Sequence, residues 1–95
     1  MSTNVATPET TEHVTIFFAD WCPFCKRLLT DLNELGTPHA LVDAEAEGTE
    51  DINAWIEAVN DGNRIVPTVL YSDGTHATNP SASEVQAKYA ELAGK

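Results

Sequence analysis

The chain has 95 residues, enough for one domain, and 42% of them are hydrophobic. Fifteen acidic and five basic residues give a formal net charge of −10, which argues against nucleic-acid binding because phosphate recognition needs clustered Lys and Arg. No apolar run is long enough to span a membrane, and residues 1–12 lack the basic start and apolar stretch of a secretory signal. We therefore expect a cytoplasmic protein with a flexible tail over residues 1–12 and one domain over residues 13–95.

Hydrophobic spacing predicts a strand, a helix and a second strand in the first half of the chain. Residues 14–18 form a β-branched and aromatic run that is typical of a buried strand. Pro23 suits the first turn of a helix, and Gly36 suits its end. A second short strand is expected at residues 40–42. The apolar face of the helix is predicted from residues at spacings of four, four and three: Phe24, Leu28, Leu32 and Leu35.

The second half predicts a helix, two strands and a last helix. Thr49 is the expected N-cap of a helix whose core-facing residues include Trp55. Strands are expected at residues 66–71 and 76–78, and the Asp-Gly pair between them favours a hairpin turn. Ser81 and Glu84 fit a capping box that begins the last helix. The first strand–helix–strand unit requires a parallel pair and the hairpin an antiparallel one, which predicts a mixed four-stranded sheet flanked by three helices.

A Cys-Pro-Phe-Cys motif at residues 22–25 lies at the predicted turn from the first strand into the first helix. Cys22 is expected at the N-cap, where unpaired backbone N–H groups and the helix dipole favour a thiolate. Lys26 and Arg27 add positive charge with the same effect. Cys25 lies one turn along the same face and is expected to be less exposed. The motif therefore predicts Cys22 as the nucleophile and Cys25 as the resolving thiol.

Two other uses of such a cysteine pair are disfavoured by the residues around it. The pair is half of a zinc site, but the chain has no second pair of cysteines, and His13, His39 and His76 lack ligand spacing. A permanent disulfide is rare in a reducing cytosol. We therefore expect no metal site and assign redox chemistry to the pair.

The chain resembles the thioredoxin fold in two segments, residues 21–25 after a strand and residues 65–68 at the start of a later one. This resemblance implies an α/β, thioredoxin-like fold. It also implies that the Val66–Pro67 peptide bond is cis, that Pro67 faces the active cysteine, and that the backbone of Val66 pairs with bound substrate.

A more specific resemblance, spanning about residues 14–92, is to the mycoredoxins, the actinobacterial branch of the glutaredoxin family that uses mycothiol. It is carried by residues 60–69, the Asp-Gly pair at 73–74, and residues 78–85. Glutathione-binding relatives usually carry a Gly-Gly stretch and an Asp before the last helix, where this chain has Thr-Asn-Pro-Ser. Glutathione favours cationic partners through its carboxylates, whereas mycothiol, a thiol on a sugar–inositol body, favours hydroxyl and amide partners.

The residues alone leave two readings of Trp21 and of Arg64. Trp21 either packs or forms a wall of the substrate site, and Arg64 is either a site residue or a solvated charge. We expect Cys22 and Cys25 to be catalytic. The expected substrate-binding residues are Trp21, Pro23, Phe24, Arg64, Val66, Pro67, Thr68, Thr78, Asn79 and Ser81.

The resemblance implies a thiol–disulfide oxidoreductase that reduces protein–mycothiol mixed disulfides through Cys22. Mycothiol is the expected electron donor and co-substrate, with no bound cofactor. We expect a monomer whose partners are S-mycothiolated or disulfide-containing proteins. We expect it to bind neither nucleic acid nor a membrane.

Two alternatives stay open. One is a general dithiol reductase of the glutaredoxin or thioredoxin type that uses glutathione or a reductase protein. The other is a module that binds an iron–sulfur cluster between two monomers.

Overall fold

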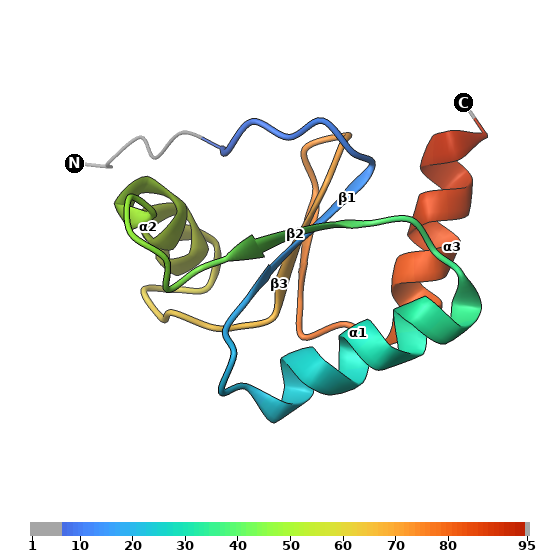
Figure 1. The fold of residues 1–95 in the computed structure, drawn as a ribbon. Coiled ribbons are helices and arrows are strands. Elements are labelled where there is room, and N and C mark those ends of the chain that lie inside the picture. Colours follow the sequence, from blue (N-terminus) through green and yellow to red (C-terminus); the bar gives the residue numbers. More distant parts are fainter. Residues whose placement is uncertain (1–6, 95) are drawn as a thin grey trace.

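The computed structural model describes residues 7–94, in which four strands and three helices follow one another in the predicted order (Figure 1). Part of the expected tail, residues 1–6, lies outside this range, and residues 7–12 form no helix or strand. No helix within residues 7–94 is long and apolar enough to cross a membrane. The elements are β1 (Val14–Phe18), α1 (Pro23–Leu35), β2 (Ala40–Asp43), α2 (Glu50–Val59), β3 (Thr68–Tyr71), β4 (His76–Thr78) and α3 (Ala82–Ala93).

The strands form one mixed sheet in the order β2-β1-β3-β4. Strand β1 pairs with β2 in parallel and with β3 in antiparallel orientation, so that Ile16 lies between Leu41 and Val69. Strands β3 and β4 form the antiparallel hairpin. The predicted mixed four-stranded sheet with three helices is confirmed, and its central strand β1 leads directly into the cysteine motif.

Helices cover both faces of the sheet, with α1 and α3 on one side and α2 on the other (Figure 1). Successive residues of a strand point to opposite faces, so Ile16 packs with α1 and α3 while Phe17 packs with α2. Trp55, expected in the core, is buried against Phe17 at a ring-centroid distance of 5.5 Å.

Helix α1 buries a narrower apolar stripe than its sequence predicts. Leu28 and Leu32 are buried as expected, but the third buried residue is Cys25. Phe24 is 61% exposed and Leu35 is 44% exposed, because they lie in the first and last turns and at the margin of the stripe. Phe24 is thereby available at the surface next to the cysteine motif.

The start of β3 differs from the sequence prediction, whereas α2 begins after Thr49 as expected but lacks the side-chain cap. Strand β3 begins at Thr68 rather than at residue 66, because Pro67 has no N–H to contribute to the ladder. The Thr49 side chain does not cap α2, since its hydroxyl donates to the carbonyl oxygens of Ala44 and Ala46. The expected capping box of Ser81 and Glu84 is present at the start of α3.

Candidate active site

The cysteine motif lies where β1 gives way to α1. A tight turn, closed by the hydrogen bond from the Cys22 N–H to the Ala19 carbonyl, places Cys22 at the N-cap and Pro23 at the first helical position. The Cys22 Sγ accepts a hydrogen bond from the Cys25 N–H at 3.1 Å. The sulfur therefore occupies the position where the helix terminus stabilises negative charge.

The segment before β3 lies directly against this sulfur. The Cys22 Sγ donates to the Val66 carbonyl oxygen at 3.5 Å. The following Val66–Pro67 bond is cis, as the resemblance implied. The Pro67 carbonyl in turn accepts from the Asn79 N–H at 2.8 Å. Three expected site residues, Val66, Pro67 and Asn79, are thus joined to Cys22 through a chain of contacts.

The two cysteines do not differ in exposure, contrary to expectation. Cys22 and Cys25 are each 1% exposed, because the Cys22 side chain also packs against Ala19, Phe18 and Val66. They differ in electrostatic surroundings. Burial raises the pKa of the Cys25 thiol to about 12, and the neighbouring Cys22 sulfur adds to this rise. Cys25 is therefore a neutral thiol at physiological pH and is not suited to the first attack.

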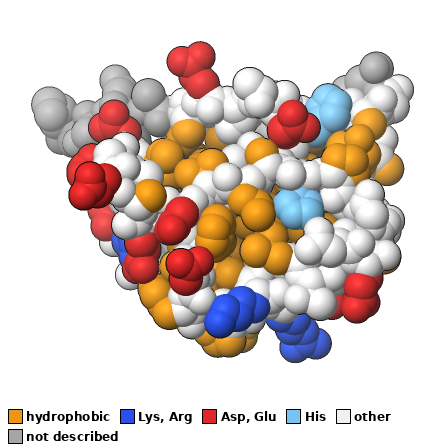
Figure 2. Space-filling view, viewed as in Figure 1, with side chains coloured by type: hydrophobic (Ala, Val, Ile, Leu, Met, Phe, Trp, Pro, Cys, Tyr) orange, Lys and Arg blue, Asp and Glu red, His pale blue; other side chains and the backbone are white. Residues whose placement is uncertain are grey.

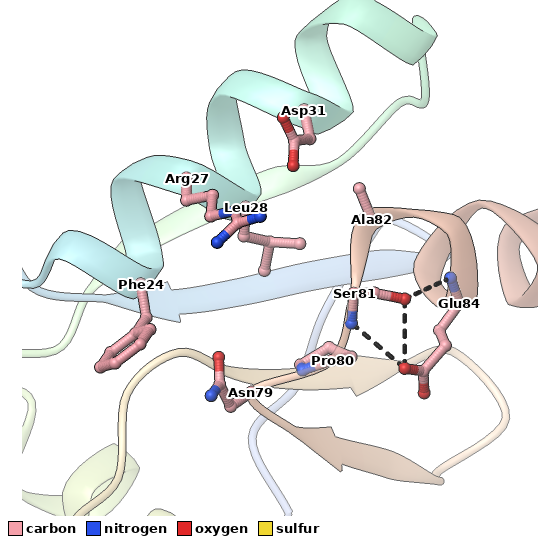
Figure 3. A pocket seen from close by; sticks show the side chains of 9 residues that line it. All are labelled: Phe24, Arg27, Leu28, Asp31, Asn79, Pro80, Ser81, Ala82 and Glu84. Atoms are coloured by element: carbon pink, nitrogen blue, oxygen red, sulfur yellow. Dashed lines mark hydrogen bonds between the residues drawn. The ribbon is translucent and has the colours of Figure 1, made fainter.

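A groove of about 440 Å³ runs from Phe24 along α1 to the start of α3 (Figure 3). It brings together three expected substrate-binding residues, Phe24, Asn79 and Ser81. The Ser81 hydroxyl already takes part in the capping box, whereas among residues 7–94 no intramolecular hydrogen bond engages the Asn79 side chain. The remaining lining residues are Arg27, Leu28, Asp31, Pro80, Ala82 and Glu84.

Two expected substrate-binding threonines, one buried and one exposed, make hydrogen bonds within the protein. Thr68 is fully buried, and its hydroxyl donates to the Ile65 carbonyl at 2.7 Å. The Thr78 hydroxyl donates to the Asn60 Oδ1. Neither residue lines the groove, and both hydroxyl groups connect neighbouring segments of the protein.

Asn60 organises this supporting layer, and sequence reasoning missed it. Its Nδ2 donates to the Ile56 carbonyl at 2.8 Å and to the Thr68 hydroxyl at 3.4 Å. Its Oδ1 accepts from Thr78, so one buried side chain connects the end of α2 with β3 and β4. In the sequence, residues 60–63 indicated the end of a helix and formed part of the mycoredoxin resemblance, but neither signal assigned a role to the Asn60 side chain.

Trp21 and Arg64 meet at a residue that the sequence did not single out. Trp21 is 62% exposed, and its Nε1 donates to the Glu45 Oε2 at 2.8 Å. Arg64 forms an ion pair with the same oxygen at 3.5 Å and donates through Nε to the Asn53 Oδ1 at 2.7 Å. Trp21 is therefore an exposed surface residue next to Cys22 and not a packed core residue, while the Arg64 guanidinium bonds to Asn53 and to the loop after β2.

Charge is distributed unevenly around the site. Figure 2 shows basic side chains at the lower edge, where α1 runs, and acidic side chains spread over the rest of that face. Lys26 and Arg27 are exposed on the first turns of α1. Within residues 7–94, no group of three or more His, Cys, Asp or Glu side chains is placed to hold a metal ion.

Comparisons with known proteins agree with this geometry. Residues 14–77 match the family model for glutaredoxin. The chain is 54% identical over 81 residues to Mycoredoxin 1 of Corynebacterium glutamicum, covering 85% of this chain and 98% of that protein. It is similar in fold to the glutaredoxin of Archaeoglobus fulgidus, with a TM-score of 0.63 and 22% identity over 80% of this chain and 84% of the other. A wheat glutaredoxin gives a TM-score of 0.60 and 24% identity over 88% and 78% of the two chains.

Proposed function

The chain belongs to the glutaredoxin family of thiol–disulfide oxidoreductases, and we propose that it reduces protein–mycothiol mixed disulfides with Cys22 as the attacking thiolate. The observation that carries the proposal is the position of the Cys22 sulfur. It accepts the N–H of Cys25 at the start of α1 and lies against the Val66 carbonyl. Helix-terminal cysteines with basic neighbours are the reactive ones in proteins.

The reaction follows from this arrangement. The Cys22 thiolate attacks the mycothiol sulfur of the mixed disulfide, the protein leaves as a thiolate that takes up a proton, and a Cys22–mycothiol disulfide forms. A second mycothiol thiolate then attacks the mycothiol sulfur of this adduct. Mycothiol disulfide is released, and the Cys22 thiolate is restored without any further oxidant or reductant.

The groove supports mycothiol as the co-substrate. The lining of the groove includes two carboxylates, from Asp31 and Glu84, but only one guanidinium, from Arg27. Such a lining disfavours the two carboxylates of glutathione. Asn79 offers an amide to the hydroxyl groups of a sugar–inositol thiol, and Phe24 offers an exposed apolar ring at the end nearest to Cys22.

The role of Cys25 separates this proposal from a general dithiol reductase. With free mycothiol as the resolving thiol, Cys22→Ser should abolish turnover of a mycothiol-modified protein and Cys25→Ser should retain it. Glutathione should replace mycothiol poorly. The measurement is steady-state release of the modified protein by each variant with each thiol. Inactivity of Cys25→Ser, or equal turnover with glutathione, would favour the dithiol reductase, while a coloured, iron-containing preparation would favour the cluster-binding module.

A further inference from the structure

We infer that Glu45 is a positioning residue that fixes the indole of Trp21 beside Cys22 and thereby favours protein-bound disulfides over small ones. The inference rests on thiol–disulfide exchange at Cys22 and not on the identity of the small thiol. One carboxylate oxygen, the Glu45 Oε2, receives both the Trp21 Nε1 at 2.8 Å and the Arg64 Nη1 at 3.5 Å. Trp21 precedes the nucleophile, and Arg64 lies two residues before Val66, which contacts the Cys22 sulfur.

The loop that presents Glu45 is itself held close to the cysteine turn. The Ala44 N–H donates to the Phe18 carbonyl at 2.8 Å, which ties the loop to the last residue of β1. The Ala44 carbonyl accepts from Asn53 at 2.8 Å and from Arg64 at 3.2 Å. These bonds fix the backbone next to Glu45. The Glu45 carboxylate is therefore held where it can accept hydrogen bonds from both Trp21 and Arg64.

An anchored indole matters more for a large substrate than for a small one. Trp21 precedes Cys22 and exposes 62% of its surface, so its ring is available to the surface of a protein whose disulfide approaches Cys22. A ring that is already held in place loses little conformational freedom when a protein surface packs on it, whereas a freely rotating ring would lose more. A small disulfide reaches the sulfur without covering this ring. Glu45 should therefore change the rate with proteins and leave the chemistry of Cys22 unchanged.

The matched variants separate the hydrogen bond from the charge. Glu45→Ala removes the acceptor, and Trp21→Phe removes the donor while keeping an aromatic ring. Glu45→Gln keeps an acceptor oxygen without the charge, and the exposed pair with Arg64 contributes little. Glu47→Ala is the control, because Glu47 is an exposed carboxylate in the same loop and makes no side-chain hydrogen bond or ion pair within residues 7–94.

The test is the single-turnover rate of pre-reduced enzyme with a mycothiol-modified protein and with hydroxyethyl disulfide. For the protein, Glu45→Ala and Trp21→Phe should each be about threefold to tenfold slower, the range that one hydrogen bond supplies. The double variant Glu45→Ala/Trp21→Phe should be no slower than the slower of the two single variants. Glu45→Gln and Glu47→Ala should stay within about twofold of the native protein, and the variants of Glu45 and Glu47 should keep their rate with hydroxyethyl disulfide.

Tryptophan fluorescence measures the mobility of the Trp21 ring directly, which reaction rates do not. The chain has two tryptophans, and Trp55 is buried in the core, so a change in fluorescence anisotropy reports on the exposed Trp21. Anisotropy should fall in Glu45→Ala and not in Glu45→Gln. Three results would overturn the inference: a rate of Glu45→Ala that falls equally with both disulfides, additive rate losses in the double variant, or unchanged anisotropy in Glu45→Ala. A native enzyme that reacts only with hydroxyethyl disulfide would instead count against the proposed mycothiol function.

Discussion

Replacing Asn60 by Ala should destabilise the protein far more than a typical loop substitution. Asn60 follows the last residue of α2 and is 9% exposed. Its amide donates to the Ile56 carbonyl at 2.8 Å and accepts from the Thr78 hydroxyl. Asn60→Ala deletes both bonds and leaves the Ile56 carbonyl, at the C-terminal end of a helix, without that donor.

The expected loss can be worked out from these contacts. Each well-formed hydrogen bond contributes about 0.5–1.5 kcal/mol, and a buried polar group left without a partner costs about 1–3 kcal/mol. The Thr68 hydroxyl keeps its bond to the Ile65 carbonyl, so it adds little to the loss. The free energy of unfolding of Asn60→Ala should therefore be about 2–4 kcal/mol lower. Thr78→Val removes one bond from the exposed end of the network and should cost about 1 kcal/mol.

Urea unfolding followed by the fluorescence of the buried Trp55 measures these losses. Asn63→Ala is the matched control, because Asn63 is exposed and its amide makes one hydrogen bond within residues 7–94, to the Asn60 carbonyl at 3.1 Å. It should change the free energy of unfolding by about 0.5 kcal/mol or less. Equal losses in Asn60→Ala and Asn63→Ala, or a loss for Asn60→Ala under about 1 kcal/mol, would refute the assigned network.

Three further predictions concern titration. Because the pKa of Cys25 is raised to about 12, iodoacetamide at pH 8 should modify Cys22 first, and mass spectrometry showing Cys25 modified first would contradict this. The unfolded chain loses the Cys25 proton near the ordinary pKa of 9.0, so the free energy of unfolding should fall as pH rises from there towards 12, and this fall should be smaller in Cys25→Ser. Hydrogen bonds from Lys88 and Thr75 hold the pKa of Asp73 well below its usual 3.8, so the stabilisation is present above pH 3.8 and is lost as pH falls through the lower value. Lys88→Met should bring the Asp73 pKa, measured by NMR, back towards 3.8, and an unchanged value would show that Lys88 is not the cause.

Local signals made most of the fold predictable. The β-branched run at residues 14–18, Pro23 at a helix start and the Ser81 capping box each act over a few residues, and each was found where expected. The buried face of α1 was predicted too wide, because residue spacing does not show that the first and last turns of a helix extend beyond the sheet and helices that it packs against. The Phe24 ring continues the apolar pattern but has no core to enter.

The supporting residues of the site could not be predicted in this way. Glu45 meets Trp21 across 24 positions in the sequence, and Asn60 meets Thr78 across 18. Nothing in the local sequence distinguishes Glu45 from other carboxylates of so acidic a chain. Only the parallel pairing of β1 with β2 brings the loop after β2 to the turn after β1. These partnerships are products of the topology and become visible only once the strand order is known.

The asymmetry between the two cysteines follows from their spacing and governs the order of the chemical steps. A separation of three residues is the capping spacing, so the Cys25 N–H bonds to the Cys22 sulfur and favours negative charge there. Burial, and to a smaller extent the same sulfur, raises the pKa of Cys25 and keeps this thiol protonated. Once Cys22 carries a disulfide, its sulfur cannot ionise, so the coulombic contribution of Cys22 to the pKa of Cys25 is absent. Burial, the largest cause, still holds the pKa of Cys25 above its ordinary value in the adduct, which disfavours a resolving step through Cys25 and favours release by an external thiol.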